Sequence, residues 1–234
     1  QTATPTTLGK EWAIFASRVQ ESLQALELLP VRGKINGATG TYSAHVAAFP
    51  EIDWIEFSQT FVTQKLHLHW NPLTPQIEPH DYQARILNEV SLLSTVLIDF
   101  SRDVWGYISL GYFGQKVVAG EVGSSTMPHK VNPIDFENAE GNLKLARGIA
   151  RTLSDELPIS RWQRDLTDST LQRNFGLVFG HFCLALKSLQ KGLGKLEEKP
   201  GKMLQDLESS PEVLTEAVQT VLRAHGHADA YDQL

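Results

Sequence analysis

The sequence has 234 residues, a net charge of −6 and a single cysteine, Cys183. A chain of this length accommodates one large domain or two small ones, and its 41% hydrophobic and 21% charged residues exclude a disordered chain or a coiled-coil rod. The acidic balance argues against nucleic-acid binding, because a duplex binder needs a surplus of lysine and arginine. One cysteine excludes a disulfide framework and a cysteine-rich metal site, and it indicates a reducing compartment, for which we expect the cytoplasm.

No segment of the sequence predicts a membrane anchor. The most apolar run, residues 175–186, is shorter than the roughly 18 residues that span a bilayer, and it contains His181. The first five residues, Gln1-Thr2-Ala3-Thr4-Pro5, lack the charged and apolar regions of a secretory signal. Because the sequence also lacks a starting methionine, we expect it to be a piece of a longer protein.

Apolar residues spaced three and four apart predict helix over most of the chain. The first helix is expected over residues 8–29, and Pro30 ends it. Residues 32–40 are rich in glycine and predict a loop or a strained turn. Asp53 is expected to cap a short helix that carries Trp54, Phe57 and Val62. The prolines of residues 70–80 predict an extended segment.

Three longer helices are predicted in the rest of the chain, over residues 81–105, 136–153 and 169–196. Residues 114–135 interrupt the helical pattern, and smaller helices fill residues 200–223. The inward-facing apolar residues are expected to be Ile86, Val90, Leu93, Leu97 and Phe100 in the first of these helices and Leu177, Val178, Leu184, Leu186 and Leu189 in the last.

These lengths predict an all-α fold. Helices of more than about 18 residues exceed the usual 11–12 and favour a long bundle. The sequence contains no convincing strand pattern and no internal repeat. We therefore expect a central helical bundle domain over residues 1–197, and the start of a small C-terminal helical domain over residues 198–234.

Residues 120–133 carry the most informative motif. Gly120 and Gly123 free the backbone, Ser124 begins a pair of adjacent serines, and Lys130 follows between two prolines. Such a loop can close over a ligand and offer an ammonium group, an amide and backbone N–H groups to an anion. The plainer alternative is a surface loop with a solvated lysine.

A second motif lies in residues 160–173. Ser169 and Arg173 are four residues apart, so they share one face of a helix near its start, and Arg164 precedes them on the incoming loop. A helix N-terminus with two guanidinium groups and a hydroxyl forms a cradle for phosphate.

Acidic residues in the same block leave a second interpretation open. Asp168 or Thr167 can cap the helix. Asp165 and Asp168 can also neutralise the arginines and make the block a surface ion-pair cluster. Against an acidic background, four cations gather in the two motifs and would attract an anionic substrate: Lys130, Arg161, Arg164 and Arg173.

The string Gly-Ser-Ser-x-Met-Pro-x-Lys-x-Asn, residues 123–132, resembles the signature loop of the fumarase/aspartase superfamily. Its continuation, together with His129, is similar to the bacterial adenylosuccinate lyase family. The second block matches that family's Arg-x4-Ser-x3-Arg nucleotide-phosphate site, and residues 70–81 and 34–40 match as well. The resemblance covers nearly the whole chain.

The resemblance implies an anti β-elimination that removes fumarate from adenylosuccinate and leaves AMP, and the same reaction on the succinyl-carboxamide imidazole ribotide. It implies no cofactor and no metal. Ser124 would be the base. The substrate-binding residues would be Gln76, Lys130, Asn132, Asn138, Arg164, Ser169 and Arg173. His129 either orders the loop or has a packing role, which we favour.

The family's general acid is a histidine in a Thr-x-His-Gly-Gln type motif, and residues 1–5 look like the continuation of that motif. We therefore expect the acid upstream of residue 1, since His45 lacks a matching context. The resemblance also implies a homotetramer in which three subunits contribute to each active site. Two alternatives stay open: a sister enzyme such as argininosuccinate lyase, and a non-catalytic helical scaffold.

Overall fold

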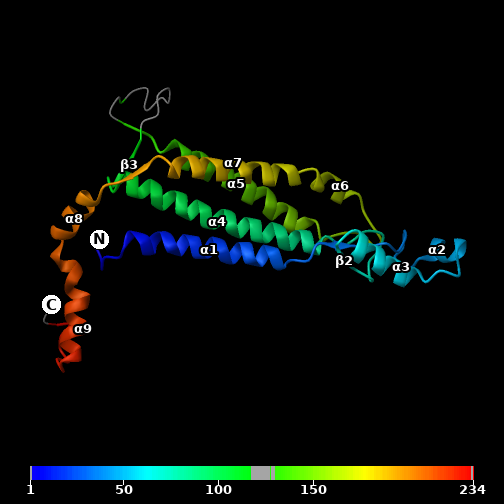
Figure 1. Ribbon diagram of the computed structural model, residues 1–234, viewed down its shortest axis with the longest axis horizontal. Coiled ribbons are helices and arrows are strands. Elements are labelled where there is room, and N and C mark those ends of the chain that lie inside the picture. The colour runs from blue at the N-terminus through cyan, green and yellow to red at the C-terminus, as the bar shows by residue number, and fades with distance from the viewer. Residues whose placement is uncertain (1, 117–126, 128–129, 233) are drawn as a thin grey trace.

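The computed structural model describes residues 2–116, 127, 130–232 and 234. Its centre is a bundle of four long helices: α1 (Leu8–Leu28), α4 (Asp81–Ser109), α5 (Ile134–Glu156) and α7 (Phe175–Leu193). Figure 1 shows them side by side, each running opposite to the helix before it in the chain. The all-α prediction is confirmed, and the predicted helices 8–29, 81–105 and 136–153 correspond to α1, α4 and α5.

Helix α5 occupies the middle of the bundle and packs against both α4 and α7. Its buried side chains divide the core into two clusters. Phe136 and Leu143 pack with Val104 near the start of α5, and Leu153 packs with Leu87 near its end. The apolar stripe predicted for α4 is confirmed, since Val90, Leu93 and Phe100 are buried and Ile86 and Leu97 are partly buried.

Short elements form one end of the molecule. Strands β1 (Arg32–Gly33) and β2 (His69–Trp70) pair in parallel, with Arg32 opposite His69. The elements between them in the chain are α2 (Ser43–Ala48), α3 (Trp54–Thr60) and the π-helix η1 (Phe61–Lys65). The predicted cap of α3 is confirmed, because the Asp53 carboxylate accepts the N–H groups of Ile55 and Glu56, each at 3.0 Å.

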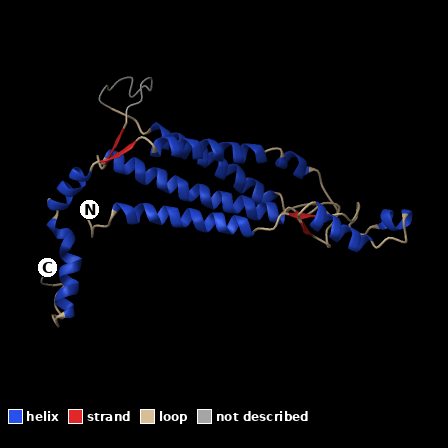
Figure 2. Cartoon of the chain, viewed as in Figure 1, coloured by secondary structure: helices blue, strands red, loops and turns tan. Residues whose placement is uncertain are grey.

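The other end contains strands β3 (Phe113–Gln115) and β4 (Leu196–Glu198), which pair antiparallel. Beyond them lie α8 (Pro200–Glu208), the 3₁₀-helix η2 (Pro211–Leu214) and α9 (Thr215–Ala224). Figure 2 shows the strand pairs at opposite ends of the bundle. The expectation of no strands was wrong, because strands of two or three residues are too short to produce a periodic signal. The predicted domain boundary after residue 197 falls within β4 and stays a prediction.

The helix predicted over residues 169–196 is two helices. Helix α6 (Thr167–Gln172) ends at Arg173, and α7 begins at Phe175. Of the five residues expected to face inward, Val178 and Leu189 are buried, whereas Leu177, Leu184 and Leu186 are 50%, 55% and 41% exposed. Helix α7 is apolar on several sides but packs mainly against α5, so its other faces stay uncovered. None of the described helices is long and apolar enough to cross a membrane.

Candidate active site

The predicted site residues lie at two separate ends of the bundle. One group, called here the lysine end, is at the start of α5 and consists of Lys130, Asn132 and Asn138. The other, the arginine end, is beyond the end of α5 and consists of Gln76, Arg164, Ser169 and Arg173. Helix α5 has 23 residues, so at 1.5 Å per residue roughly 34 Å separates the two groups. Figure 1 shows the start of α5 at β3 and its end near α6.

A single chain therefore does not combine both groups in one pocket. The expected cationic patch is divided, with Lys130 at one end and Arg161, Arg164 and Arg173 at the other. The expectation of one patch overlooked the length of the helix predicted over residues 136–153, which lies between the two motifs. Ser124 and His129 lie outside the described residues.

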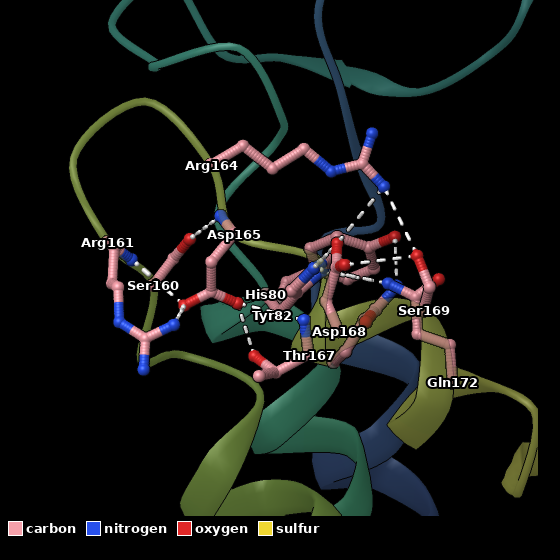
Figure 3. A network of polar contacts seen from close by, with 11 residues as sticks. His80, Tyr82, Ser160, Arg161, Arg164, Asp165, Thr167, Asp168, Ser169 and Gln172 are labelled. Carbon is pink, nitrogen blue, oxygen red and sulfur yellow. Dashed lines mark hydrogen bonds and ion pairs between the residues drawn. The ribbon is translucent and has the colours of Figure 1, made fainter.

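Arg164 and Ser169 contact each other at the arginine end. The Arg164 Nη2 atom donates to the Ser169 Oγ atom at 3.4 Å, and it lies 3.6 Å from the Asp168 Oδ2 atom. Figure 3 shows Arg164 reaching from its loop towards Asp168 and Ser169 on α6. Arg173, the residue that ends α6, is exposed. Ser169, which contacts Arg164, is thus about one helical turn from Arg173 in the backbone.

The ion-pair interpretation of this block is also present in the structure. Asp165 pairs with Arg161 at 3.8 Å, and Asp168 pairs with Arg164. Among the described residues, no ion pair involves Arg173. The arginine end therefore presents one guanidinium held by a carboxylate and one exposed guanidinium, a suitable arrangement for an incoming anion.

The predicted cap of this helix was wrong. Leu166 is the N-cap residue of α6 and makes no side-chain cap, whereas Thr167 and Asp168 lie inside its first turn. The Asp165 carboxylate instead accepts hydrogen bonds from the Thr167 hydroxyl and backbone N–H. These bonds to Thr167 are the main cause of the lowered pKa of Asp165, and the N–H and charge of Arg161 also contribute.

Gln76 is held by backbone contacts from two sides. Its N–H donates to the carbonyl of Gln163 at 3.2 Å, which joins the extended segment to the arginine loop. The Nζ atom of Lys34, a partly buried residue, donates to the carbonyls of Gly37, Pro75 and Gln76 at 3.0, 3.1 and 2.5 Å. Burial lowers the pKa of Lys34. The glycine-rich stretch thus fixes the segment that carries Gln76.

Gly40 shows why this stretch is rich in glycine. Its φ is +71°, and a Cβ atom there would lie 1.9 Å from the backbone oxygen of Thr74. A side chain would therefore displace the segment that contains Gln76.

Sequence reasoning missed His80, which is buried beside this group. The Nε2 atom of His80 lies 3.4 Å from the Asp168 Oδ2 atom. The sequence shows only that a histidine comes directly before a long predicted helix. This position does not tell whether the side chain contacts α6 or packs in the core. His45, the weak substitute for the acid, packs against the rings of Tyr42 and Trp54, with centroids at 5.8 and 4.9 Å.

The lysine end is organised by an ion pair that the sequence did not predict. The buried Lys195 Nζ atom lies 2.7 Å from the Asp135 carboxylate in the first turn of α5. The carbonyl of Lys195 accepts the N–H of Lys116 at 2.8 Å. One residue therefore connects the chain that follows β3 to the start of α5, on both sides of the signature motif.

Asn138 and Lys130 differ in their surroundings. The Asn138 Oδ1 atom accepts hydrogen bonds from Ser188 Oγ at 2.9 Å and Asn142 Nδ2 at 3.0 Å. Lys130 is exposed, and its backbone N–H donates to the Met127 carbonyl at 3.0 Å. The Lys130 ammonium thus extends towards solvent at this end.

Two hollows lie near the two ends, and neither joins them. One of about 490 Å³ is beside the arginine loop, lined by Ser160, Arg161 and Asp165 among others. One of about 380 Å³ lies between the N-terminal segment, the end of α4 and α8. Within the described part of the chain, no group of three or more His, Cys, Asp or Glu side chains could hold a metal ion.

The fold and these motifs match known protein families. The protein family described as Lyase matches residues 1–148, more than half of the sequence, and the chain belongs to this family. The family described as Adenylosuccinate lyase C-terminal matches residues 160–234.

More particularly, the chain is 53% identical over all 234 residues to adenylosuccinate lyase from Escherichia coli strain K12 and 52% identical to the enzyme of the same name from Vibrio cholerae. The chain spans about half the length of these curated relatives, 51% in each. The expected resemblance to bacterial adenylosuccinate lyases is confirmed.

Solved structures share the fold. A 3-carboxy-cis,cis-muconate lactonizing enzyme from Pseudomonas putida superposes with a TM-score of 0.71 and 25% identity, over 100% of this chain and 52% of that one. A fumarate lyase from Mesorhizobium superposes with a TM-score of 0.72 and 21% identity, over 99% of this chain and 51% of that one. The second likeness, at this identity, concerns the fold alone.

Proposed function

We propose that the protein containing this chain is a cytoplasmic adenylosuccinate lyase that eliminates fumarate from adenylosuccinate and from the succinyl-carboxamide imidazole ribotide. The observation that carries the proposal is the contact of Arg164 with Ser169 one turn from Arg173, because this spacing suits a ribose phosphate common to both substrates. The roughly 50% identity to enzymes of that name supports it.

In the proposed reaction, Ser124 removes a proton from the carbon next to a substrate carboxylate. The C–H electron pair moves into that carboxylate, which becomes an aci-anion, and its collapse expels the purine nitrogen as the second carbon–carbon bond of fumarate forms. The leaving nitrogen takes a proton from a general acid, which the resemblance assigns to a histidine not among residues 1–234. A serine hydroxyl needs strong stabilisation as an alkoxide, which the positive charge of Lys130 would supply, and the exclusion of water would strengthen that attraction.

The other residues bind the substrate in this proposal. Lys130 and Asn132 bind the substrate carboxylate whose negative charge grows in the transition state. Gln76 and Asn138 contact the substrate. No cofactor or metal takes part in the proposed chemistry.

The separation of the two ends gives the proposal a structural requirement. A nucleotide is much shorter than the roughly 34 Å length of α5, so the lysine end and the arginine end of one chain cannot both contact the same substrate. Copies of the chain must bring opposite ends together, which closed symmetry with antiparallel bundles provides. We therefore propose active sites shared between subunits, and the family resemblance implies that the assembly is a homotetramer.

Helix α7 supports this assembly. Leu177, Phe179, Leu184 and Leu186 are 50%, 40%, 55% and 41% exposed along it. Apolar side chains that repeat along the uncovered faces of a helix are expected to be buried against another helix.

Activity on defined substrates tests the proposal. The full-length protein is mixed with adenylosuccinate or argininosuccinate, and the release of fumarate is followed by absorbance. We expect turnover of adenylosuccinate alone. Turnover of argininosuccinate alone would replace the proposal with the sister enzyme, and the absence of turnover with either would favour the scaffold.

Mixing two impaired variants tests the shared site, at an adenylosuccinate concentration far below the KM of Arg173→Ala, where each variant alone is nearly inactive. Full-length Ser124→Ala and Arg173→Ala are coexpressed, purified through different tags and compared with each variant alone. Random assembly combines the intact serine of one subunit with the intact arginine of another in about one quarter of the sites, so about that share of the normal activity should return. If coexpression restores nothing, both residues belong to the same subunit's site, and the composite arrangement fails.

A further inference from the structure

His80 and Asp168 form a buried contact between residues 88 positions apart in the chain. His80 precedes the first residue of α4, Asp168 is in the first turn of α6, and each is 7% exposed. The His80 Nε2 atom lies 3.4 Å from the Asp168 Oδ2 atom and 3.1 Å from the Gln172 Nε2 atom. Figure 3 shows the imidazole between Asp168 and Gln172, on the side of α6 that faces α4.

Asp168 also contacts two of the three predicted phosphate ligands. Its Oδ2 atom lies 3.6 Å from Arg164, and its Oδ1 atom accepts a hydrogen bond from the Ser169 hydroxyl at 3.3 Å. A carboxylate in this position holds the guanidinium and the hydroxyl in one arrangement. It also places a negative charge beside a site proposed for an anion, which would weaken binding unless the charge were offset.

The surroundings show how the charge is offset. Burial alone would raise the pKa of Asp168, but the His80 contact, the Arg164 charge and the bonds from Ser169 together lower it, so the carboxylate is ionised at neutral pH. His80 and Arg164 both contact its Oδ2 atom. Helix α6 has only six residues, too few to hold Arg164 and Ser169 in place by its own hydrogen bonds.

We infer that His80 and Asp168 are a positioning pair for the phosphate site, in which Asp168 aligns Arg164 and Ser169 and His80 holds Asp168 against the start of α4. The inference rests on the proposed function, since it assigns the partner of a nucleotide phosphate. Neither residue touches the ligand. Their effect on binding is transmitted through Arg164 and Ser169.

The inference makes a prediction opposite in sign to simple electrostatics. Removing a negative charge beside a phosphate should strengthen phosphate binding if the carboxylate only repels the ligand. If Asp168 aligns the cradle, Asp168→Asn should weaken binding instead, because the neutral amide loses the charge-assisted contact with Arg164.

The experiment measures AMP and adenosine affinities of the full-length protein by calorimetry, together with kcat and KM for adenylosuccinate. Asp168→Asn and His80→Gln should each weaken AMP binding and raise KM about 10- to 100-fold, with a smaller change in kcat. Adenosine affinity should stay constant, because adenosine has no phosphate. A substitution that only destabilised the protein would lower the affinities for AMP and adenosine alike.

Asp165→Asn is the matched control. It removes one carboxylate from the same block but from a residue that pairs with Arg161, so the ratio of AMP to adenosine affinity should match that of the wild type. The double variant His80→Gln/Asp168→Asn should lose less than the sum of the single losses, because the two residues act as one unit. Melting temperatures identify a variant that fails to fold, and the other single variant then carries the test.

Two results would overturn the inference in different ways. Unchanged or tighter AMP binding by Asp168→Asn, in a wild-type protein that turns over adenylosuccinate, would refute the positioning pair and leave the proposed function standing. A wild-type protein that neither bound AMP nor released fumarate would refute the proposed function and the inference together.

Discussion

At the arginine end, the side chains proposed to meet a phosphate already contact neighbours in the same chain, since Arg164 touches Asp168 and Ser169. At the lysine end, Lys130 is exposed, and order comes from the buried pair of Asp135 and Lys195 behind it. The difference indicates two kinds of preparation. The arginine end fixes the side chains of Arg164 and Ser169 themselves, whereas the lysine end fixes the backbone from which Lys130 extends.

This comparison predicts that substitutions at the two ends change different kinetic constants. Variants at the lysine end should lower kcat, because the proposed chemistry takes place there. Variants at the arginine end should raise KM, because the phosphate is remote from the bond that breaks.

Ser124→Ala should have the largest effect on activity. Loss of the proposed base should lower kcat about 100- to 10,000-fold, while the affinity for AMP stays close to that of the wild type. Fumarate release and AMP calorimetry measure the two quantities. Ser125→Ala is the matched control, with little expected change in kcat. If Ser125→Ala instead abolishes turnover, the base is the second serine of the pair.

Lys195→Met should have the largest effect on stability. The substitution leaves the buried Asp135 carboxylate without its 2.7 Å partner, and breaking a buried pair from one side costs about 3–5 kcal/mol of the free energy of unfolding. Lys191, 3.6 Å from Asp135, reduces this loss. Urea unfolding of the full-length protein at fixed concentration measures it.

The control for this variant is Lys202→Met, which removes a 2.6 Å pair with Asp206 whose side chains are 42% and 37% exposed. Such a pair contributes about 0–1 kcal/mol. Equal losses for the two lysines would show that the Asp135 pair does not organise the lysine end.

Arg173→Ala should raise KM about 10- to 100-fold for both proposed substrates and change kcat less, because it removes a charge-assisted contact to their common phosphate. Arg161→Ala, which removes an exposed arginine paired with Asp165, should change KM less than threefold or so. Steady-state kinetics on both substrates provide the comparison. An unchanged KM for Arg173→Ala would remove this residue from the phosphate site.

The sequence predicted the long helices well because each has an apolar stripe of the right period and a proline, capping residue or glycine-rich stretch at its end. It failed where tertiary contacts decide. The break at Arg173 between α6 and α7 has no glycine or proline to mark it, and Leu184 is apolar although no part of the described chain covers it.

The candidate site was predictable as a set of residues but not as an arrangement. The motifs identify Arg164, Ser169 and Lys130 by chemistry and spacing. Their division between two ends follows from the length of α5, whereas the contact of His80 with Asp168 depends on how α4 and α6 meet. That contact is a consequence of packing over a long sequence distance, which local patterns do not encode.

The smallest expected effect concerns the seam between α4 and α5, which also differs at the two ends. Near the lysine end, the Glu140 carboxylate contacts Arg102 at 2.9 Å and Lys144 at 2.7 Å. Nearer the arginine end, Arg151 and Arg147 donate to the hydroxyls of Ser91 and Thr95 at 3.2 and 3.4 Å.

Burial alone would raise the pKa of Glu140, but its contacts with Lys144 and Arg102 outweigh burial and lower it. A lowered folded-state pKa stabilises the fold above the unfolded-state value of about 4.3, and this contribution disappears as the pH falls through the folded-state value.

Glu140→Gln should therefore cost about 0.5–1 kcal/mol of the free energy of unfolding at pH 7 and almost nothing at pH 3. Ser91→Ala loses a hydrogen bond whose partners do not titrate in this range, so its deficit of about 0.5–1 kcal/mol should be the same at both pH values. Urea unfolding of wild type and both variants at the two pH values measures the differences. A deficit of Glu140→Gln that persisted at pH 3 would mean that packing, and not charge, holds α4 to α5 at the lysine end, and the contrast between the two ends of the seam would disappear.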